Sequence, residues 1–176
     1  MGGMMDEKGF AVDREMQLVA FKVGREDFGV DVQKVEGVIS LVDITRMPRA
    51  PHFVEGIINL RGQIIAVVDL ATRLGIEAAE RGSATRIVVV EAQDVKVGLI
   101  VDSPEVININ KDDIEASPTL AASDVTSSFI RGIVKLDDRL LIVLDVTRVL
   151  SSEERFDIGE FDFLAVSEAG AGEEEQ

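Results

Sequence analysis

Short runs of apolar residues, rich in valine and isoleucine and separated by turn residues, fill the chain from Gln17 onward. Residues 18–23 are mostly apolar, and in 28–32 apolar positions alternate with Gly29 and Asp31, as expected for strands. Further strands are expected at residues 56–60, 63–68, 85–92, 95–101, 106–110, 129–136 and 139–144. This pattern predicts an all-β fold in which helix is a minor component.

Two stretches depart from simple alternation. Val35, Val38, Ile39 and Val42 recur at roughly helical spacing, which leaves a short helix or an irregular strand open, and residues 44–47 follow before a proline-rich break at 48–51. Elsewhere Asp69 is placed to cap a short helix at 70–74 that Gly75 ends. Asp145 is likewise placed to cap a helix at 146–150.

The chain contains an internal duplication. The segment 53–60 (FVEGIINL) returns 76 residues later as 129–136 (FIRGIVKL), and Asp69 meets Asp145 at the same offset. Each copy is a five-strand unit of roughly 65 residues, small for an independent core. We therefore expect two five-stranded barrels, SH3-like or OB-like, that share a core.

Two of the expected strands are apolar at every position, namely 64–68 and 140–144. A strand with two apolar faces needs cover on both sides. One face is expected to line the strand's own barrel, and the other to meet the twin barrel or the short helices.

Composition excludes several kinds of chemistry. The 176-residue chain has no cysteine and one histidine, which excludes disulfides, thiolate metal sites and any site with two imidazoles. The net charge is −15, and residues 152–176 alone hold nine acidic groups against one arginine. An oligonucleotide-binding barrel stays an alternative, but it would need a basic groove with stacking aromatics, and the chain has neither Trp nor Tyr.

A search for catalytic motifs finds no phosphate-binding loop, nucleophile elbow or zinc-protease helix. His52 is read as a surface turn residue, and the pairs Asp112-Asp113 and Asp137-Asp138 as turn formers, rather than as catalytic groups. We therefore expect no enzyme activity, no cofactor and no metal.

The two copies differ at one hairpin tip, where Arg61-Gly62 in the first copy corresponds to Asp137-Asp138 in the second. A solvated tip can change charge freely, so a neutral difference is one interpretation. The other is that Arg61 donates hydrogen bonds to a partner, a role that suits its planar fork. The valines at 32, 35 and 38 form a stripe that, by spacing alone, is more often core than interface.

The segment 44–70 (ITRMPRAPHFVEGIINLRGQIIAVVDL) resembles the signature of the CheW family, the coupling proteins of bacterial chemotaxis. The resemblance extends over residues 17–151 and includes 97–102 (VGLIVD) and Gly132-Ile133 in the second copy. Two departures are modest: the family often has a glutamate near Gly37 and a proline at Ala66. Both chain ends lie outside the resemblance.

The resemblance implies a pair of SH3-like barrels without catalytic activity. Such a protein would link the regulatory domain of the CheA histidine kinase to the cytoplasmic tip of methyl-accepting chemoreceptors. A rival within the same family is a detached regulatory domain of a kinase or a receiver-fused coupling protein. The length opposes it, because 176 residues leave no room for a kinase core or a receiver. The implied receptor groove is lined by Val32, Val35, Val38 and Pro104, with Arg61 near its edge, and the implied kinase contact uses Ile44 and Met47.

The domain organisation follows from these patterns. Residues 1–16 are expected to be flexible, and 17–151 to hold barrel one (about 17–82) and barrel two (about 83–151), with strands shared between the barrels as an open alternative. In 152–166, Phe156, Ile158, Phe161 and Leu164 are placed to form a docked helix, followed by an acidic tail to residue 176. No signal peptide or anchor pattern is present, so we expect a soluble cytoplasmic protein, without membrane insertion, that is recruited to receptor arrays at the inner face of the membrane.

Overall fold

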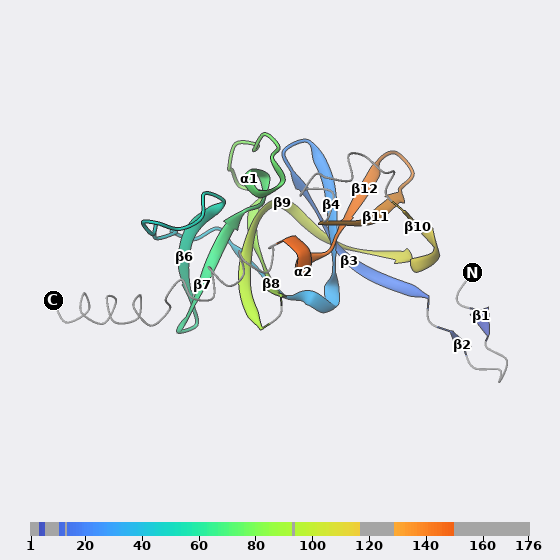
Figure 1. Ribbon diagram of the computed structural model, residues 1–176. Helices are drawn as coiled ribbons and strands as arrows, with labels where there is room; N and C mark the ends of the chain where they lie inside the picture. Colours follow the sequence, from blue (N-terminus) through green and yellow to red (C-terminus); the bar gives the residue numbers. More distant parts are fainter. Residues whose placement is uncertain (1–3, 6–10, 13, 93, 117–128, 150–176) are drawn as a thin grey trace.

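The computed structural model describes residues 4–5, 11–12, 14–92, 94–116 and 129–149 (Figure 1). Most of them lie in β-strands. In chain order the elements are β1 (Met4–Met5), β2 (Ala11–Val12), β3 (Glu15–Val23), β4 (Glu26–Asp31), η1 (Val32–Lys34), β5 (Val35–Ser40), β6 (Val54–Leu60), β7 (Gln63–Asp69), α1 (Leu70–Leu74), β8 (Thr85–Ala92), β9 (Val95–Asn110), η2 (Lys111–Asp113), β10 (Ile114–Glu115), β11 (Ile130–Lys135), β12 (Leu140–Leu144) and α2 (Val146–Val149).

The strands from β3 to β12 form two SH3-like barrels, as predicted, which lie side by side in Figure 1. The barrel on the left, here the β7 barrel, contains β5, β6, β7, β8 and the first half of β9. The barrel on the right, here the β12 barrel, contains β3, β4, β10, β11, β12 and the second half of β9. Strand β9 therefore runs through both barrels.

The two copies of the duplicated unit exchange strands. The hairpin β3–β4 of the first copy joins β11 and β12 of the second, and β4 runs parallel to β12. In the same way, β8 and the first half of β9 join β6 and β7 of the first copy, and β9 runs parallel to β7. Each barrel thus needs both copies, which ties the two together through backbone hydrogen bonds.

Three hydrophobic cores result. Ile65 and Val67 of β7 point into the β7 barrel, whereas Ala66 and Val68 of the same strand belong to a central core between the barrels. In β12, Leu141 and Val143 fill the β12 barrel, whereas Leu144 lies in the central core. This confirms the prediction that both strands are covered on two faces, except at Leu140 at the start of β12, which is 58% exposed. Each face follows the two-residue period of a strand.

Equivalent short-range contacts repeat in both copies. Asp69 caps α1 by accepting from the backbone N–H of Ala71 at 3.1 Å, and Gly75 ends the helix in the left-handed region (φ 73°). Asp145 accepts from the N–H of Thr147 at 3.0 Å at the start of α2. Both predicted caps are confirmed, because they depend on residues only two or three positions apart.

Residues 35–40 form a strand, so of the two alternatives the irregular strand is correct; it has a register shift between Val35 and Gly37. Of residues 44–47, Thr45 makes an isolated bridge to Ile57. The expected strands 95–101 and 106–110 are one bent strand, β9, with Ser103 at positive φ (49°).

The two-barrel domain begins slightly before residue 17. β3 begins at Glu15, and Met16 is buried in the core of the β12 barrel. The helix expected in 152–166 and the acidic tail lie outside the described residues. No helix in the described ranges is long and apolar enough to cross a membrane.

Candidate functional site

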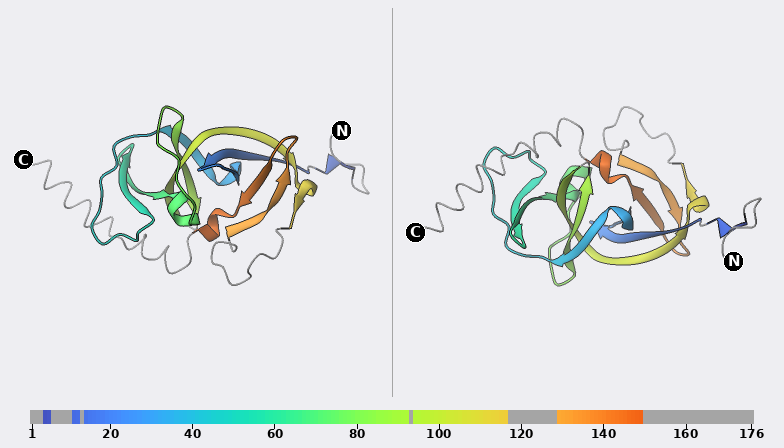
Figure 2. Two further views of the ribbon diagram at one scale, coloured as in Figure 1. Left: turned by 90° about the horizontal axis from the view of Figure 1, so that it is seen from above. Right: turned by 90° about the horizontal axis from the view of Figure 1, so that it is seen from below.

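The predicted valine stripe lies where the two barrels meet. Asp31 accepts a hydrogen bond from the backbone N–H of Gln33 at 2.9 Å and so caps η1, which contacts β3 of the β12 barrel and β8 of the β7 barrel. Val32 of η1 and Val35 of β5 are half-buried and pack against the central core. Seen from below, η1 stands at the junction (Figure 2, right).

Val38 is the exposed member of this stripe, with 45% of its surface accessible. It lies opposite Val88 in the antiparallel pair β5–β8, and Val88 belongs to the central core. Side chains of directly opposed residues point to the same face of a sheet. Val38 therefore points to the same side of the sheet as the central core, toward the junction of the barrels. It lies at the margin of that core, where no other described residue covers it fully.

Val106 has the corresponding place on the other barrel, and the sequence analysis did not identify it. It lies opposite Val19 of the central core and is 59% exposed. Ile107 and Ile109 belong to the core of the β12 barrel, so Val106 points to the opposite face of β9. The two-residue period of a strand along 105–109 could have placed Val106 on the opposite face from Ile107 and Ile109.

A hollow of about 330 Å³ lies beside this stripe, between η1, β3 and the second half of β9. Its apolar members are Val32 and Met16, and the polar residues around it are Glu15, Gln17, Asp31, Gln33, Asn108 and Lys111. Of the predicted receptor-binding residues, Val32 alone lines this hollow. Its mostly polar lining favours contact with a polar flank of a partner rather than capture of an apolar small molecule.

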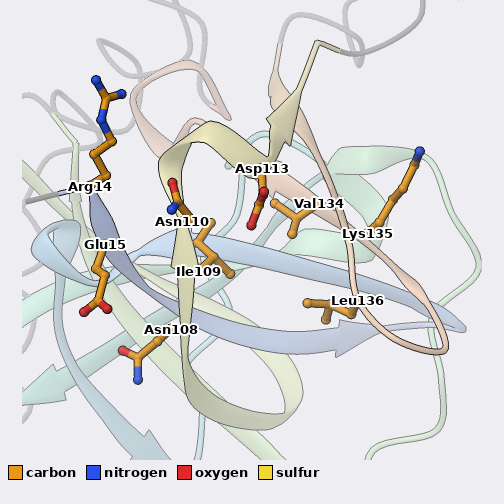
Figure 3. Close-up of a pocket in the computed structure, with 9 residues that line it drawn as sticks. All are labelled: Arg14, Glu15, Asn108, Ile109, Asn110, Asp113, Val134, Lys135 and Leu136. Atoms are coloured by element: carbon orange, nitrogen blue, oxygen red, sulfur yellow. The ribbon is translucent and has the colours of Figure 1, made fainter. Parts of the chain in front are cut away.

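A second hollow, of about 310 Å³, opens at the end of the β12 barrel (Figure 3). Its wall includes Ile109, Val134 and Leu136, and in Figure 3 Arg14 and Lys135 extend away from it. Arg14 is engaged with the carboxylate of Asp112, with 2.8 Å between Nη1 and Oδ1. None of the predicted partner-binding residues lines this hollow.

Arg61 lies at the tip of the hairpin β6–β7 and is exposed. Arg61 and Gly62 both have positive φ (53° and 85°), and the side chain of Asn59 accepts from the N–H of Gly62 at 2.8 Å. These values match the tight two-residue turns whose twist suits a hairpin. Arg61 is thus held on a well-defined tip, with its side chain in solvent.

The tip is linked to β5 through Lys96. The ammonium group of Lys96 lies 3.4 Å from the side-chain oxygen of Gln63 and 3.3 Å from the carboxylate of Glu36. Gln63 begins β7 directly after the turn, and Glu36 lies two residues before Val38. The structure therefore brings the Arg61 hairpin close to the strand that carries Val38.

Pro104, half-buried, follows the bend of β9 at Ser103 and lies two residues before Val106.

The charge difference between the two hairpin tips extends beyond Arg61 and Asp137. Gly98 pairs with Val67, and Gly29 pairs with Val143, so Lys96 and Asp27 have equivalent positions. Asp27 lies 3.6 Å from Arg139 and 3.4 Å from Lys22, the reverse of the arrangement around Lys96. The two ends of the molecule therefore have opposite charges at their centres: Lys96 is 34% exposed, whereas Asp27 is only 14% exposed between its two cations.

The predicted kinase-binding residues lie on the outer side of the β7 barrel. Ile44 is half-buried and packs against the core of that barrel, and Met47 is half-buried in the loop that follows. Thr45, between them, exchanges two backbone hydrogen bonds with Ile57 at 2.9 and 2.8 Å. Val42, which the sequence analysis did not assign to a surface, is 45% exposed in the same segment.

His52 is exposed and packs edge-on against Phe53, with 5.6 Å between ring centroids, which agrees with its reading as a surface turn residue. Among the described residues, no group of three or more His, Cys, Asp or Glu side chains is arranged to hold a metal ion. What the described surface presents is exposed valines at the junction of two barrels, a basic hairpin tip and a second apolar segment on one barrel.

The model of the CheW-like domain matches residues 17–154, which include both barrels. The chain belongs to the CheW family. The chemotaxis protein CheW of Rhizobium meliloti (strain 1021) is 36% identical over 140 residues, which cover 79% of this chain and 90% of that protein. The CheW protein of Thermotoga maritima is 38% identical over 138 residues, covering 78% of this chain and 89% of that protein.

A solved structure gives the same result for the fold. The scaffolding protein TtCheW of Thermoanaerobacter tengcongensis superposes with a TM-score of 0.72 at 38% identity, covering 79% of this chain and 90% of that one. Of the two departures from the CheW pattern, Ala66 lies buried in β7, hydrogen-bonded between β6 and β9. Gly37 has open space where a side chain would start, so both departures leave the CheW fold intact.

Proposed function

We propose that this protein is a non-catalytic adaptor of bacterial chemotaxis that couples transmembrane chemoreceptors to the CheA histidine kinase. The observation that carries the proposal is the CheW family match, which spans both barrels. The structural relative TtCheW is described as a scaffolding protein. The adaptor would work in the cytoplasm, held at receptor arrays on the inner face of the membrane by its two partners.

The receptor tip is proposed to bind at the junction of the barrels. The contact would use Val32, Val35, Val38 and Pro104, with Arg61 at its edge. Val106 extends the same surface onto the second barrel, opposite Val38. An amphipathic helical partner needs an apolar strip with polar borders, and the exposed valines beside a polar hollow offer this combination.

The regulatory domain of the kinase is proposed to bind the β7 barrel around Ile44 and Met47. Both side chains are only half-exposed, so Val42 would supply much of the free apolar area of this contact. The surface lies on a single barrel, whereas the proposed receptor surface uses both. An adaptor needs two such separable surfaces, because one partner must stay bound while the other docks.

Two charge substitutions test this arrangement. Val38→Glu should weaken binding to a chemoreceptor signalling fragment about tenfold or more and leave binding to the kinase regulatory domain unchanged. Met47→Glu should do the opposite, so each variant serves as the control for the other. The proposal fails if the unmodified protein binds neither partner, or if both variants bind both partners as tightly as it does.

A further inference from the structure

One cation contacts both copies of the duplicated unit. The guanidinium carbon of Arg73 in α1 lies 4.9 Å from the ring centroid of Phe53 and 4.5 Å from that of Phe129. Both rings are almost completely buried, at 2% and 1% exposure, and Arg73 is half-buried, so these cation–π contacts are partly shielded from water. Such contacts are stronger when they are desolvated.

The two rings have equivalent places in the two barrels. Phe53 directly precedes β6 in the β7 barrel, and its carbonyl accepts from the N–H of Asp69 at 2.9 Å. Phe129 directly precedes β11 in the β12 barrel, and its carbonyl accepts from the N–H of Asp145 at 2.7 Å. Arg73 therefore bridges the same point of both barrels.

The bridge is not duplicated. At the offset of 76 residues, the position equivalent to Arg73 is Val149, which carries no charge. One planar guanidinium, always charged and able to stack on aromatic faces, thus serves both copies.

We propose that Arg73 is a positioning residue that fixes the angle between the two barrels. Through that angle it would set the separation of Val38 and Val106, which lie on opposite barrels at the junction. The consequence for receptor binding depends on the function proposed above, but the effect on the barrel angle does not. Binding to the β7 barrel alone should be insensitive to Arg73.

The barrel angle can be measured directly because the chain has no cysteine. Glu91→Cys in β8 and Arg131→Cys in β11 place one spin label on an exposed strand position of each barrel. Pulsed electron paramagnetic resonance then gives the distribution of distances between them. Arg73→Met should broaden this distribution, and Arg73→Lys, which keeps the cation without the planar stacking, should give an intermediate width.

Receptor binding is measured on the same variants without labels. If Arg73→Met reduces the binding-competent arrangement to about one fifth, affinity for the receptor fragment falls about fivefold, while affinity for the kinase regulatory domain stays the same. A thermal unfolding curve for each variant shows that it is folded; should Arg73→Met not fold, Arg73→Gln takes its place.

Two results would overturn the role of Arg73. One is a distance distribution in the neutral variant as narrow as in the unmodified protein. The other is equal broadening in Arg73→Lys and Arg73→Met, which would show that the cation does not matter. If the unmodified protein fails to bind the receptor fragment, the proposed function is wrong, and the distance measurement still decides the role of Arg73.

Discussion

Gly56 in β6 and Gly132 in β11 are equivalent residues that each allow another segment of chain to pass close by. A Cβ atom at Gly56 would overlap the carbonyl oxygen of Thr45 and lie 2.8 Å from Cγ2 of Ile44. A Cβ atom at Gly132 would lie 2.7 Å from the carbonyl oxygen of Glu115. The first close approach holds the segment that carries the proposed kinase contact against the β7 barrel.

Gly56→Ala should therefore destabilise the protein by about 2 kcal/mol or more, because the backbone at Thr45 must move away. Gly37→Ala is the matched control, since a Cβ there meets nothing within 4 Å. Urea unfolding of both variants checks this. Equal stability of the two would show that the approach of Thr45 to β6 is looser than described.

A substitution at Arg61 is expected to affect partner binding much more than the stability of the fold. It is exposed on a hairpin tip whose equivalent carries Asp137, so Arg61→Glu should change the free energy of unfolding by no more than about 0.5 kcal/mol. If the tip meets a partner, the same change should weaken assembly by about 2 kcal/mol or more, on the scale of an interface hot spot.

The matched control is Arg25→Glu, the same charge reversal on the exposed turn between β3 and β4. Thermal unfolding and co-sedimentation with kinase and receptor are measured on both variants. Unfolding of Arg61→Glu, or normal assembly by a folded Arg61→Glu, would show that the residue is not an interface group.

At the scale of elements, each copy of the duplicated unit ends in a capped short helix. α1 has five residues, too few to be stable alone, so its cap and its buried side chains Leu70, Ala71 and Leu74 hold it in place. α1 also carries Arg73, so its position matters for the junction between the barrels. The two capped helices could be predicted from the sequence because capping depends on neighbouring residues.

Asp69→Ala should cost about 1 kcal/mol or more in the free energy of unfolding, since it removes the acceptor for the N–H groups at the start of α1. Asp69→Asn is the control, because asparagine caps helices about as well as aspartate. Chemical unfolding of the two variants gives the difference. A loss as large in Asp69→Asn would point to the charge, which lies 3.9 Å from Arg81, rather than to the cap.

At the scale of the whole molecule, the internal duplication could be predicted from the sequence, but the exchange of strands between the two copies could not. The offset of 76 residues predicted two barrels, and the unbroken apolar runs 64–68 and 140–144 predicted the two-sided burial of β7 and β12. The parallel pairing of β4 with β12 leaves no local trace, because it joins strands from opposite ends of the domain. The two-residue period of 105–109 indicates the face on which Val106 lies, but its exposure depends on what the neighbouring barrel leaves uncovered.

The acidic tail gives a prediction at this scale. Residues 167–176 (SEAGAGEEEQ) contain almost no apolar surface, so their deletion should leave the thermal midpoint and partner binding nearly unchanged. Thermal unfolding and binding of the shortened chain check this. A large drop in thermal midpoint would show that the tail packs against the barrels.

One small protein is proposed to bridge two partners through separate surfaces. Co-sedimentation of the kinase with membranes that contain chemoreceptors, as a function of added adaptor, tests this bridging. The unmodified protein should carry kinase into the pellet, while Val38→Glu should stay with the kinase in the supernatant and Met47→Glu should pellet without it. Pelleting of kinase that is the same with and without the adaptor would show that this protein does not bridge the two.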